Sequence, residues 1–236
     1  MATILAVDTS AKSVSCALVR GGRVLASFFS NTGLTHSQTM LPMVEDLLRV
    51  ADVTVEDLDA LAVNVGPGSF TGVRIGVAAV KGLAFTGDKP CVAVSTLESM
   101  AMNVPLTPDM AVCGVMDARC QQVYTALFSV NEEGALIRLW DDEAISIADL
   151  GERLKGIDKE IVLVGDGSEL CYDTLKGVVN GLTLAPASAR LQNALGTALV
   201  AERLFEQGVT DTAEELLPTY LRLPQAEREL NARLGK

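Results

Sequence analysis

Basic residues are scarce in this sequence. Lysine and arginine together number 19 against 30 aspartates and glutamates, so the 236-residue chain carries a net charge of −11. A protein that binds nucleic acid by itself neutralises the phosphates with a basic stripe, and this sequence contains none. We therefore expect any role in a nucleic-acid pathway to depend on a more basic partner. The simpler alternative is that the acidic surface only keeps the protein soluble.

Paired cysteines and long apolar runs are missing as well. The five cysteines are odd in number and include no Cys-x-x-Cys pair, so we expect buried, reduced thiols rather than disulfides. No apolar run approaches the roughly 20 residues that cross a bilayer, and residues 1–5 include no basic residue. These absences predict neither a membrane anchor nor a signal peptide, and they favour a cytoplasmic location.

The most informative stretch that is present is a glycine-rich segment, residues 66–76, with the sequence GPGSFTGVRIG. It follows the apolar run 61–65 and leads into the small residues 77–83, so we predict a strand, a tight loop and a helix. The N–H groups at the start of such a helix are free, and glycines, which lack side chains, let a ligand approach them closely. Such a site can bind phosphate. The alternative is a tight turn without a ligand. The spacing matches neither the dinucleotide-binding pattern nor the P-loop.

The first half of the chain predicts a three-stranded meander followed by alternating helices and strands. The expected strands are residues 3–8, 14–20, 23–29, 57–65 and 91–94. After a polar loop at 31–35, one helix is expected, with Pro42 in its first turn. Its apolar signal is Leu41, Val44, Leu47, Leu48 and Ala51. Another is expected from Ser95, with Glu98 three residues later as the second member of a capping box.

The second half repeats this pattern after a linker at residues 104–108. Its first strand ends at Asp117 as the chain's first strand ends at Asp8, and the run VYTAL repeats VSCAL at the same offset. The segment GDGS at 165–168 likewise matches GPGS at 66–69. Further elements are expected at 135–140, 147–154, 161–164 and 189–205, before an irregular tail. Two copies of one α/β unit predict an N-terminal lobe, 1–105, and a C-terminal lobe, 106–236.

This duplicated β-β-β-α-β-α unit resembles the two-lobed α/β actin-like (ASKHA, RNase H-like) fold of sugar kinases and Hsp70-type ATPases. The resemblance implies a nucleotide between the lobes. The candidate nucleotide or phosphate contacts are Asp8, Thr9, Ser10, Gly66, Gly68 and Ser69. For Asp8 the alternative is a turn aspartate that accepts hydrogen bonds from nearby backbone N–H groups. Arg74 and Arg119 are further candidates, each of which could instead pair with an acidic neighbour.

Several motifs together resemble the bacterial TsaB family, formerly YeaZ, over nearly the whole chain. They are Asp8-Thr9-Ser10, His36-Ser37, Leu41-Pro42, the segment 66–76, Met116-Asp117-Ala118-Arg119, Val123-Tyr124 and Pro218-Thr219-Tyr220-Leu221-Arg222. The resemblance implies a non-catalytic subunit in the synthesis of threonylcarbamoyladenosine beside the tRNA anticodon. It also implies a TsaD-type catalytic partner, a TsaE-type ATPase, tRNA contact only through the complex, a homodimer when isolated, and no cofactor.

The residues support a non-catalytic role. The resemblance implies that the catalytic paralogue carries a His-x-x-x-His metal pair where this chain has Thr96 and Met100, which offer no imidazole to a metal. The single histidine, His36, is either a locally satisfied helix-start residue or a catalytic group. We predict no catalytic and no metal-binding residue. The alternatives are an ATP-dependent phosphotransferase or ATPase of the same fold and, with less support, a glycoprotease-like metalloprotease.

Small residues after the glycine-rich loop predict a close helix contact. Gly72, Gly76 and Ala79 share one helix face, and a glycine inside a helix costs about 1 kcal/mol relative to alanine. The contact is either internal or, as the resemblance implies, made with a second subunit. For the second alternative the expected interface residues are His36, Met40, Val44, Leu47, Gly72, Ile75, Gly76 and Ala79.

Overall fold

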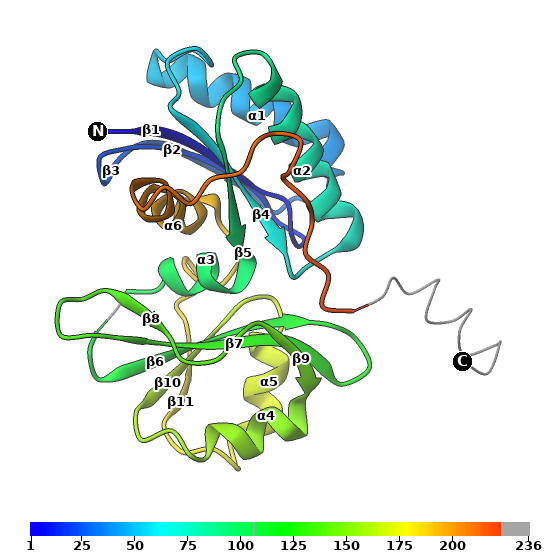
Figure 1. Cartoon of the computed structure of the whole chain (residues 1–236). Coiled ribbons are helices and arrows are strands. Elements are labelled where there is room, and N and C mark those ends of the chain that lie inside the picture. The colour runs from blue at the N-terminus through cyan, green and yellow to red at the C-terminus, as the bar shows by residue number, and fades with distance from the viewer. Residues whose placement is uncertain (106, 223–236) are drawn as a thin grey trace.

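The chain folds into two α/β lobes, each built on one mixed sheet (Figure 1). The structure is a computed structural model that describes residues 1–105 and 107–222. Over these residues the first sheet has the strand order β3-β2-β1-β4-β5. The second has the order β11-β10-β6-β7-β8, with β9 also paired to β7. The meander followed by parallel strands occurs twice, which confirms the predicted duplication and the actin-like fold.

The first sheet is covered by helices on both faces. Its strands are β1 (Thr3–Asp8), β2 (Val14–Arg20), β3 (Arg23–Ser30), β4 (Ala60–Gly66) and β5 (Cys91–Ser95). Alternate residues of β1 point to opposite faces. Leu5 and Val7 pack with α1 (His36–Ala51) and α2 (Phe70–Phe85), whereas Ile4 packs with α6 (Ala194–Glu206). Strands β1 and β4 are buried along their whole length because both faces are covered.

The second sheet is covered in the same way. Its strands are β6 (Met110–Asp117), β7 (Gln122–Val130), β8 (Leu136–Arg138), β9 (Glu143–Ser146), β10 (Glu160–Val164) and β11 (Leu182–Leu184). Helices α4 (Ile147–Leu154) and α5 (Ser168–Leu175) pack on one face. Helix α3 (Thr96–Met102) packs on the other face and lies between the two sheets in Figure 1.

The C-terminal part of the chain returns to the first lobe. Helix α6 packs on the first sheet through a face of small residues, and Leu216 is fully buried in the core under α1 and α2. Farther along, the backbone N–H of Thr219 donates to the carbonyl of Val65 at 2.7 Å. The lobe boundary expected between residues 105 and 106 stays a prediction. The structure adds that α6 and the tail pack on the first sheet although they follow the second sheet in sequence.

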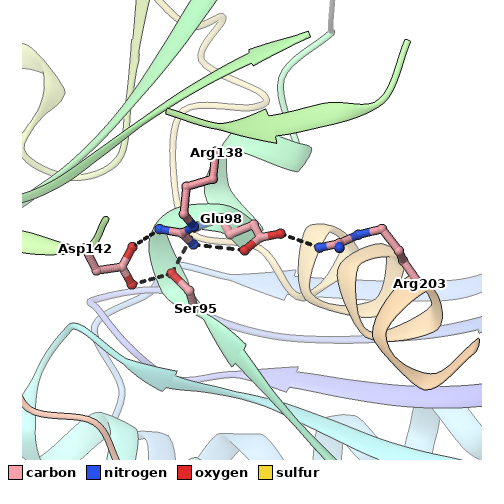
Figure 2. Close-up of polar contacts among 5 residues, drawn as sticks. All are labelled: Ser95, Glu98, Arg138, Asp142 and Arg203. Carbon is pink, nitrogen blue, oxygen red and sulfur yellow. Dashed lines mark hydrogen bonds and ion pairs between the residues drawn. The ribbon is translucent and has the colours of Figure 1, made fainter. Parts of the chain in front are cut away.

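A polar network joins α3 to both lobes, as Figure 2 shows. The Glu98 carboxylate accepts hydrogen bonds from Arg138 of β8, at 2.9 Å, and from Arg203 of α6. Arg138 also pairs with Asp142, whose second oxygen accepts from Ser95 Oγ at 2.6 Å. The predicted capping box is therefore half formed. Ser95 Oγ accepts from the Glu98 N–H at 3.3 Å, but the Glu98 carboxylate serves the two arginines instead of closing the box.

Several element boundaries differ from the predictions. Helix α1 begins at His36, so Pro42 lies inside the helix and not in its first turn. Proline inside a helix removes one hydrogen bond, and burial of the apolar face of α1 offsets that loss. The long helix begins at Ala194 rather than at 189, because the Asn193 side chain caps the Leu195 N–H at 2.9 Å. The strand expected at 135–140 is shorter, and β9 was missed.

Among the described residues, no helix combines the length and the apolar character that a membrane crossing requires.

Candidate functional site

A cavity of about 390 Å³ lies between the two lobes. The first lobe contributes the turn after β1 and the glycine-rich loop, the second lobe contributes the turn after β6, and the tail contributes residues 219–222. Three basic side chains line this interlobe cleft: Lys12, Arg119 and Arg222. Asp117 and Asp166 line the cleft as well, so its charge is mixed. The cleft lies at the place where the actin-like resemblance predicts a nucleotide.

Asp8 lies beneath the cleft wall and is 1% exposed. Its Oδ1 accepts from the Ser10 N–H at 2.8 Å and from Ser10 Oγ at 2.6 Å, which is the turn arrangement offered as the alternative to a ligand contact. Its Oδ2 has no hydrogen-bond partner among the described residues. Burial raises the pKa of Asp8, and the bonds from Ser10 oppose that rise. Of the first predicted motif, only Ser10 lines the cleft.

The glycines of the loop admit backbone atoms of neighbouring segments. Gly66 has a φ of +129°, and a Cβ there would overlap the carbonyl oxygen of Thr219. A Cβ on Gly68 would overlap the carbonyl oxygen of Ser10, which also accepts from the Ser69 N–H at 2.7 Å. A tight turn thus accounts for these glycines without a ligand. The predicted phosphate contact at the loop stays a prediction.

The small residues of α2 make an internal contact. Thr9 Oγ1 donates to the carbonyl of Gly72 at 2.7 Å. A Cβ on Gly72 would overlap the carbonyl oxygen of Thr9, and a Cβ on Gly76 would lie 2.5 Å from Thr9 Oγ1 and 3.1 Å from Val63. Of the two alternatives for these glycines, the structure therefore has the internal one.

The predicted interface residues divide by burial. Met40, Val44, Leu47, Gly72 and Gly76 are buried in the first lobe. His36, Ile75 and Ala79 are half-buried. For the second alternative, all eight were expected to contact a partner. A buried side chain reaches another subunit only if the lobe rearranges, and the interface itself stays a prediction. The buried members therefore act, in this structure, as core residues.

Sequence reasoning missed the exposed apolar residues on the same two helices. Leu41 and Val50 of α1 are 49% and 62% exposed, and Phe85 of α2 is 85% exposed. Ala78 and Gly82 are exposed small residues of α2. We refer to these five as the α1–α2 surface. The signal in the sequence was an apolar residue on the polar side of each helix pattern.

His36 is held by an internal contact, and so are Thr96 and Met100, the two residues that stand where the resemblance implies a metal-binding His pair in the catalytic paralogue. His36 Nε2 is 2.7 Å from the carbonyl oxygen of Ala11, so the ring ties the start of α1 to the turn after β1. Thr96 and Met100 are fully buried in α3. Within residues 1–105 and 107–222, no three His, Cys, Asp or Glu side chains are grouped so that they could hold a metal ion.

The tail is fixed across the cleft by aromatic and cationic contacts. Arg74 Nε donates to the Tyr220 hydroxyl at 2.8 Å, and its guanidinium lies 3.8 Å from the centroid of the Phe70 ring. The rings of Phe70 and Tyr220 are 4.8 Å apart. Arg222 donates to the carbonyl of Ala118 in the second lobe at 3.1 Å. Arg74 therefore pairs with aromatic rings rather than with an acidic neighbour, and the tail reaches from α2 to the second lobe.

Comparison with known proteins gives one consistent result. The family model described as "TsaD: tRNA N6-adenosine threonylcarbamoyltransferase" matches residues 30–230. The chain is 35% identical to the tRNA threonylcarbamoyladenosine biosynthesis protein TsaB of Escherichia coli over 232 residues, which cover 96% of this chain and 97% of that protein. It is 31% identical to the tRNA N6-adenosine threonylcarbamoyltransferase of Jannaschia over 128 residues, which cover 46% of this chain and 36% of that enzyme. The solved structure of YeaZ from Pseudomonas aeruginosa superposes with a TM-score of 0.75 at 29% identity, covering 94% of this chain and all of that one.

Proposed function

The chain belongs to the TsaB family of tRNA threonylcarbamoyladenosine biosynthesis proteins, and from that premise we propose that it is a non-catalytic subunit that binds and supports a TsaD-type threonylcarbamoyltransferase. Its role in the pathway follows from family membership. The absence of catalysis, the identity of the partners and the residues that contact them are our proposals.

The observation that carries the non-catalytic role is the state of Thr96 and Met100. Both side chains are fully buried in α3 between the lobes, and neither offers a nitrogen ligand. A catalytic metal needs three or so protein ligands and an open position for substrate. These two positions provide neither, and the match to the Jannaschia enzyme covers only 36% of that enzyme's length.

We assign partner binding to the α1–α2 surface. Phe85, Val50 and Leu41 expose large apolar side chains on two neighbouring helices of the first lobe. On α2, Phe85 shares one face with Ala78 and Gly82, at steps of three and four residues, and an exposed apolar face is typical of a protein interaction site. Helix pairs that present small residues, here Ala78 and Gly82, also allow a second helix pair to approach closely. The occupant in the complex is the TsaD-type subunit, and in the isolated protein it is a second copy of this chain.

Contact with tRNA falls to the partners. The net charge of −11 disfavours binding of a polyanion by this chain alone. A TsaE-type ATPase would act on the assembled complex.

The cleft is the observation that supports a second candidate, an ATP-dependent phosphotransferase or ATPase. It brings Lys12, Arg119 and Arg222 together around about 390 Å³. For that function Ser10, Gly68 and Ser69 would contact the phosphates. Against it, the Ser69 N–H is already bonded to the carbonyl of Ser10, and residues 219–222 form one wall of the cavity.

A reconstituted modification assay tests the proposal. With TsaD-type and TsaE-type proteins, tRNA, ATP and the threonylcarbamoyl donor present, omission of this chain should abolish product. The purified chain alone should neither modify tRNA, nor hydrolyse ATP, nor shift tRNA in a gel at physiological salt. ATP hydrolysis by the chain alone would support the second candidate instead.

A matched pair of variants tests the surface. Phe85→Ser should reduce co-purification of the TsaD-type subunit by at least tenfold while the melting temperature stays near that of the wild type, because the side chain is exposed. Leu139→Ser, which changes a 48% exposed leucine of the second lobe, is the control and should leave partner binding unchanged. Equal effects of the two variants would contradict the proposed interface.

A further inference from the structure

The tail crosses from the first lobe to the second, and we call its residues 216–222 the strap. Leu216 is fully buried in the core of the first lobe. The Thr219 N–H donates to a carbonyl of β4 at 2.7 Å, and the Tyr220 hydroxyl accepts from Arg74 of α2 at 2.8 Å. The strap is therefore fastened to the first lobe at successive points along its length.

The hold of the strap on the second lobe is much smaller. Arg222 donates to the carbonyl of Ala118 at 3.1 Å. In the part of the chain that the structure describes, this is the one hydrogen bond between the strap and the second lobe. Because a single bond opens more readily than several together, the strap can leave the second lobe while it stays on the first.

Ala118 belongs to a strained turn, residues 118–121, which joins β6 to β7. Three residues in succession, Arg119, Cys120 and Gln121, have left-handed backbone conformations, with φ angles of +67°, +55° and +57°. A residue with a Cβ takes this conformation at a steric cost, and it normally does so singly. Elsewhere among the described residues, non-glycine residues with a positive φ occur one at a time. Such a turn persists only where its surroundings hold it in place.

Hydrogen bonds from both lobes hold the β6–β7 turn. Asp117 Oδ1 accepts from the Arg119 N–H at 2.8 Å, and the Gln121 carbonyl accepts from the first N–H of α4 at 3.0 Å. Both of these partners belong to the second lobe. The bond from Arg222 to the Ala118 carbonyl comes instead from the strap. The strap therefore adds a restraint on the turn that the second lobe does not provide by itself.

We propose that the strap and the β6–β7 turn form a latch on the interlobe cleft. In the latched state, which is the one described above, Arg222 holds Ala118, and both Arg119 and residues 219–222 line the cleft. In the released state Arg222 leaves Ala118 and the turn relaxes to ordinary backbone conformations. Arg119 and the end of the strap then withdraw from the cleft wall. The latch makes access to the cleft depend on the C-terminal part of the chain.

Hydrogen exchange followed by NMR in the full chain tests the latch. Arg222→Met removes the hydrogen bond to Ala118 and keeps an unbranched side chain. The N–H groups of Gln122 and Ile147 donate to carbonyls of the turn, at 3.1 and 3.0 Å, so they report on the turn and not on the strap. Their exchange should become about fivefold faster or more, because the released turn no longer fixes their acceptors. The Thr219 N–H should keep its protection, since the strap stays on β4.

A control variant separates this effect from a general effect of losing an arginine. Arg49→Met changes an exposed arginine whose partner, Asp46, lies on the same helix. It should leave the exchange of Gln122, Ile147 and Thr219 unchanged.

A second pair of variants tests the strain. Glycine adopts the left-handed conformation without the steric cost, so in a Cys120→Gly background the turn has less strain to release. There Arg222→Met should change the exchange of Gln122 and Ile147 by less than about twofold. Cys120→Ala is the matched background, because it also removes the exposed thiol but keeps the Cβ, and there the full effect should remain.

Three results would overturn the proposal. The first is exchange at Gln122 and Ile147 that Arg222→Met leaves unchanged, since the turn would then hold without the strap. The second is an equal effect of Arg222→Met in the Cys120→Gly and Cys120→Ala backgrounds, since strain would then have no part. The third is a loss of protection at Thr219 as large as that at Gln122, since the strap would then detach from both lobes together.

Discussion

Replacement of Gly76 by alanine should destabilise the protein, whereas the same replacement at Gly82 on the same helix should stabilise it. A Cβ on Gly76 would lie 2.5 Å from Thr9 Oγ1 and 3.1 Å from Val63 Cγ2, while a Cβ on Gly82 would have no atom within 4 Å. Alanine gains about 1 kcal/mol of helix propensity at either position. The two variants therefore share the favourable contribution and differ only in what surrounds the new methyl group.

The magnitude at Gly76 follows from how its neighbour is held. Thr9 Oγ1 donates to the carbonyl of Gly72, so it cannot rotate away without losing a buried hydrogen bond, worth about 1 kcal/mol. Overpacking adds roughly 1–3 kcal/mol. After the helix gain is subtracted, Gly76→Ala should lower the free energy of unfolding by about 1–3 kcal/mol.

Urea unfolding followed by circular dichroism measures the difference, with thermal melts beside it. The two variants should differ by about 2–4 kcal/mol, which for a chain of this size corresponds to roughly 4–16 °C in melting temperature. If the free energies of unfolding of Gly76→Ala and Gly82→Ala differ by less than about 0.5 kcal/mol, the contact between α2 and the turn after β1 has room for a methyl group, contrary to the distances given above.

Three more predictions follow from buried or paired side chains. In the native protein a thiol reagent at pH 8 should label exposed Cys120 quickly and leave Cys113 unlabelled, since burial raises the pKa of Cys113 to about 12; fast labelling of more than one thiol per chain would contradict this. Burial raises the pKa of Asp8 above its ordinary value of 3.8, so the unfolded chain ionises first and stability falls as pH rises through the folded pKa. Asp8→Asn should reduce that fall, which urea unfolding between pH 4 and 7 measures. A difference in unfolding free energy between the wild type and Asp8→Asn that stays constant over this range would refute the assignment. Glu98→Gln should lower the free energy of unfolding by about 1.5–3 kcal/mol, because Arg138 and Arg203 lose their shared carboxylate. The loss should shrink in high salt, and urea unfolding with and without 1 M salt checks this; a salt-independent loss would contradict the ionic account.

The sequence predicted the fold well because its signals are local. The offset between Asp8 and the run at 14–18 recurs after Asp117, and GDGS at 165–168 matches GPGS at 66–69; together these repeats indicated two copies of one unit. Boundaries were less predictable where a tertiary contact decides them. Pro42 was expected in the first turn of its helix, but α1 begins at His36, directly after the expected loop, and the buried Met40 lies ahead of the proline in the helix.

The candidate site was less predictable because its residues meet only in the folded chain. The glycines at 66 and 68 suggested a phosphate loop, yet the atoms that require glycine there belong to Thr219 and Ser10. No local pattern shows that the tail will cross the loop. The small residues Gly72, Gly76 and Ala79 likewise indicated a close helix contact, but sequence alone does not show whether the contact is internal or made with a second subunit. Phe85 lies outside this set and is the most exposed large apolar residue of α1 and α2.

The return of α6 to the first sheet has a consequence for how the chain is made. The face of that sheet formed by Ile4, Ala6 and Val92 is covered by Ala194, Ala198 and Ala201. On the ribosome, the first lobe must therefore wait with an apolar face uncovered while the whole second lobe is synthesised. The second lobe has both of its covering layers encoded within residues 96–184 and can complete its core earlier. Nascent chains stalled before residue 194 should consequently be the species that chaperones hold, and full-length release should end that contact.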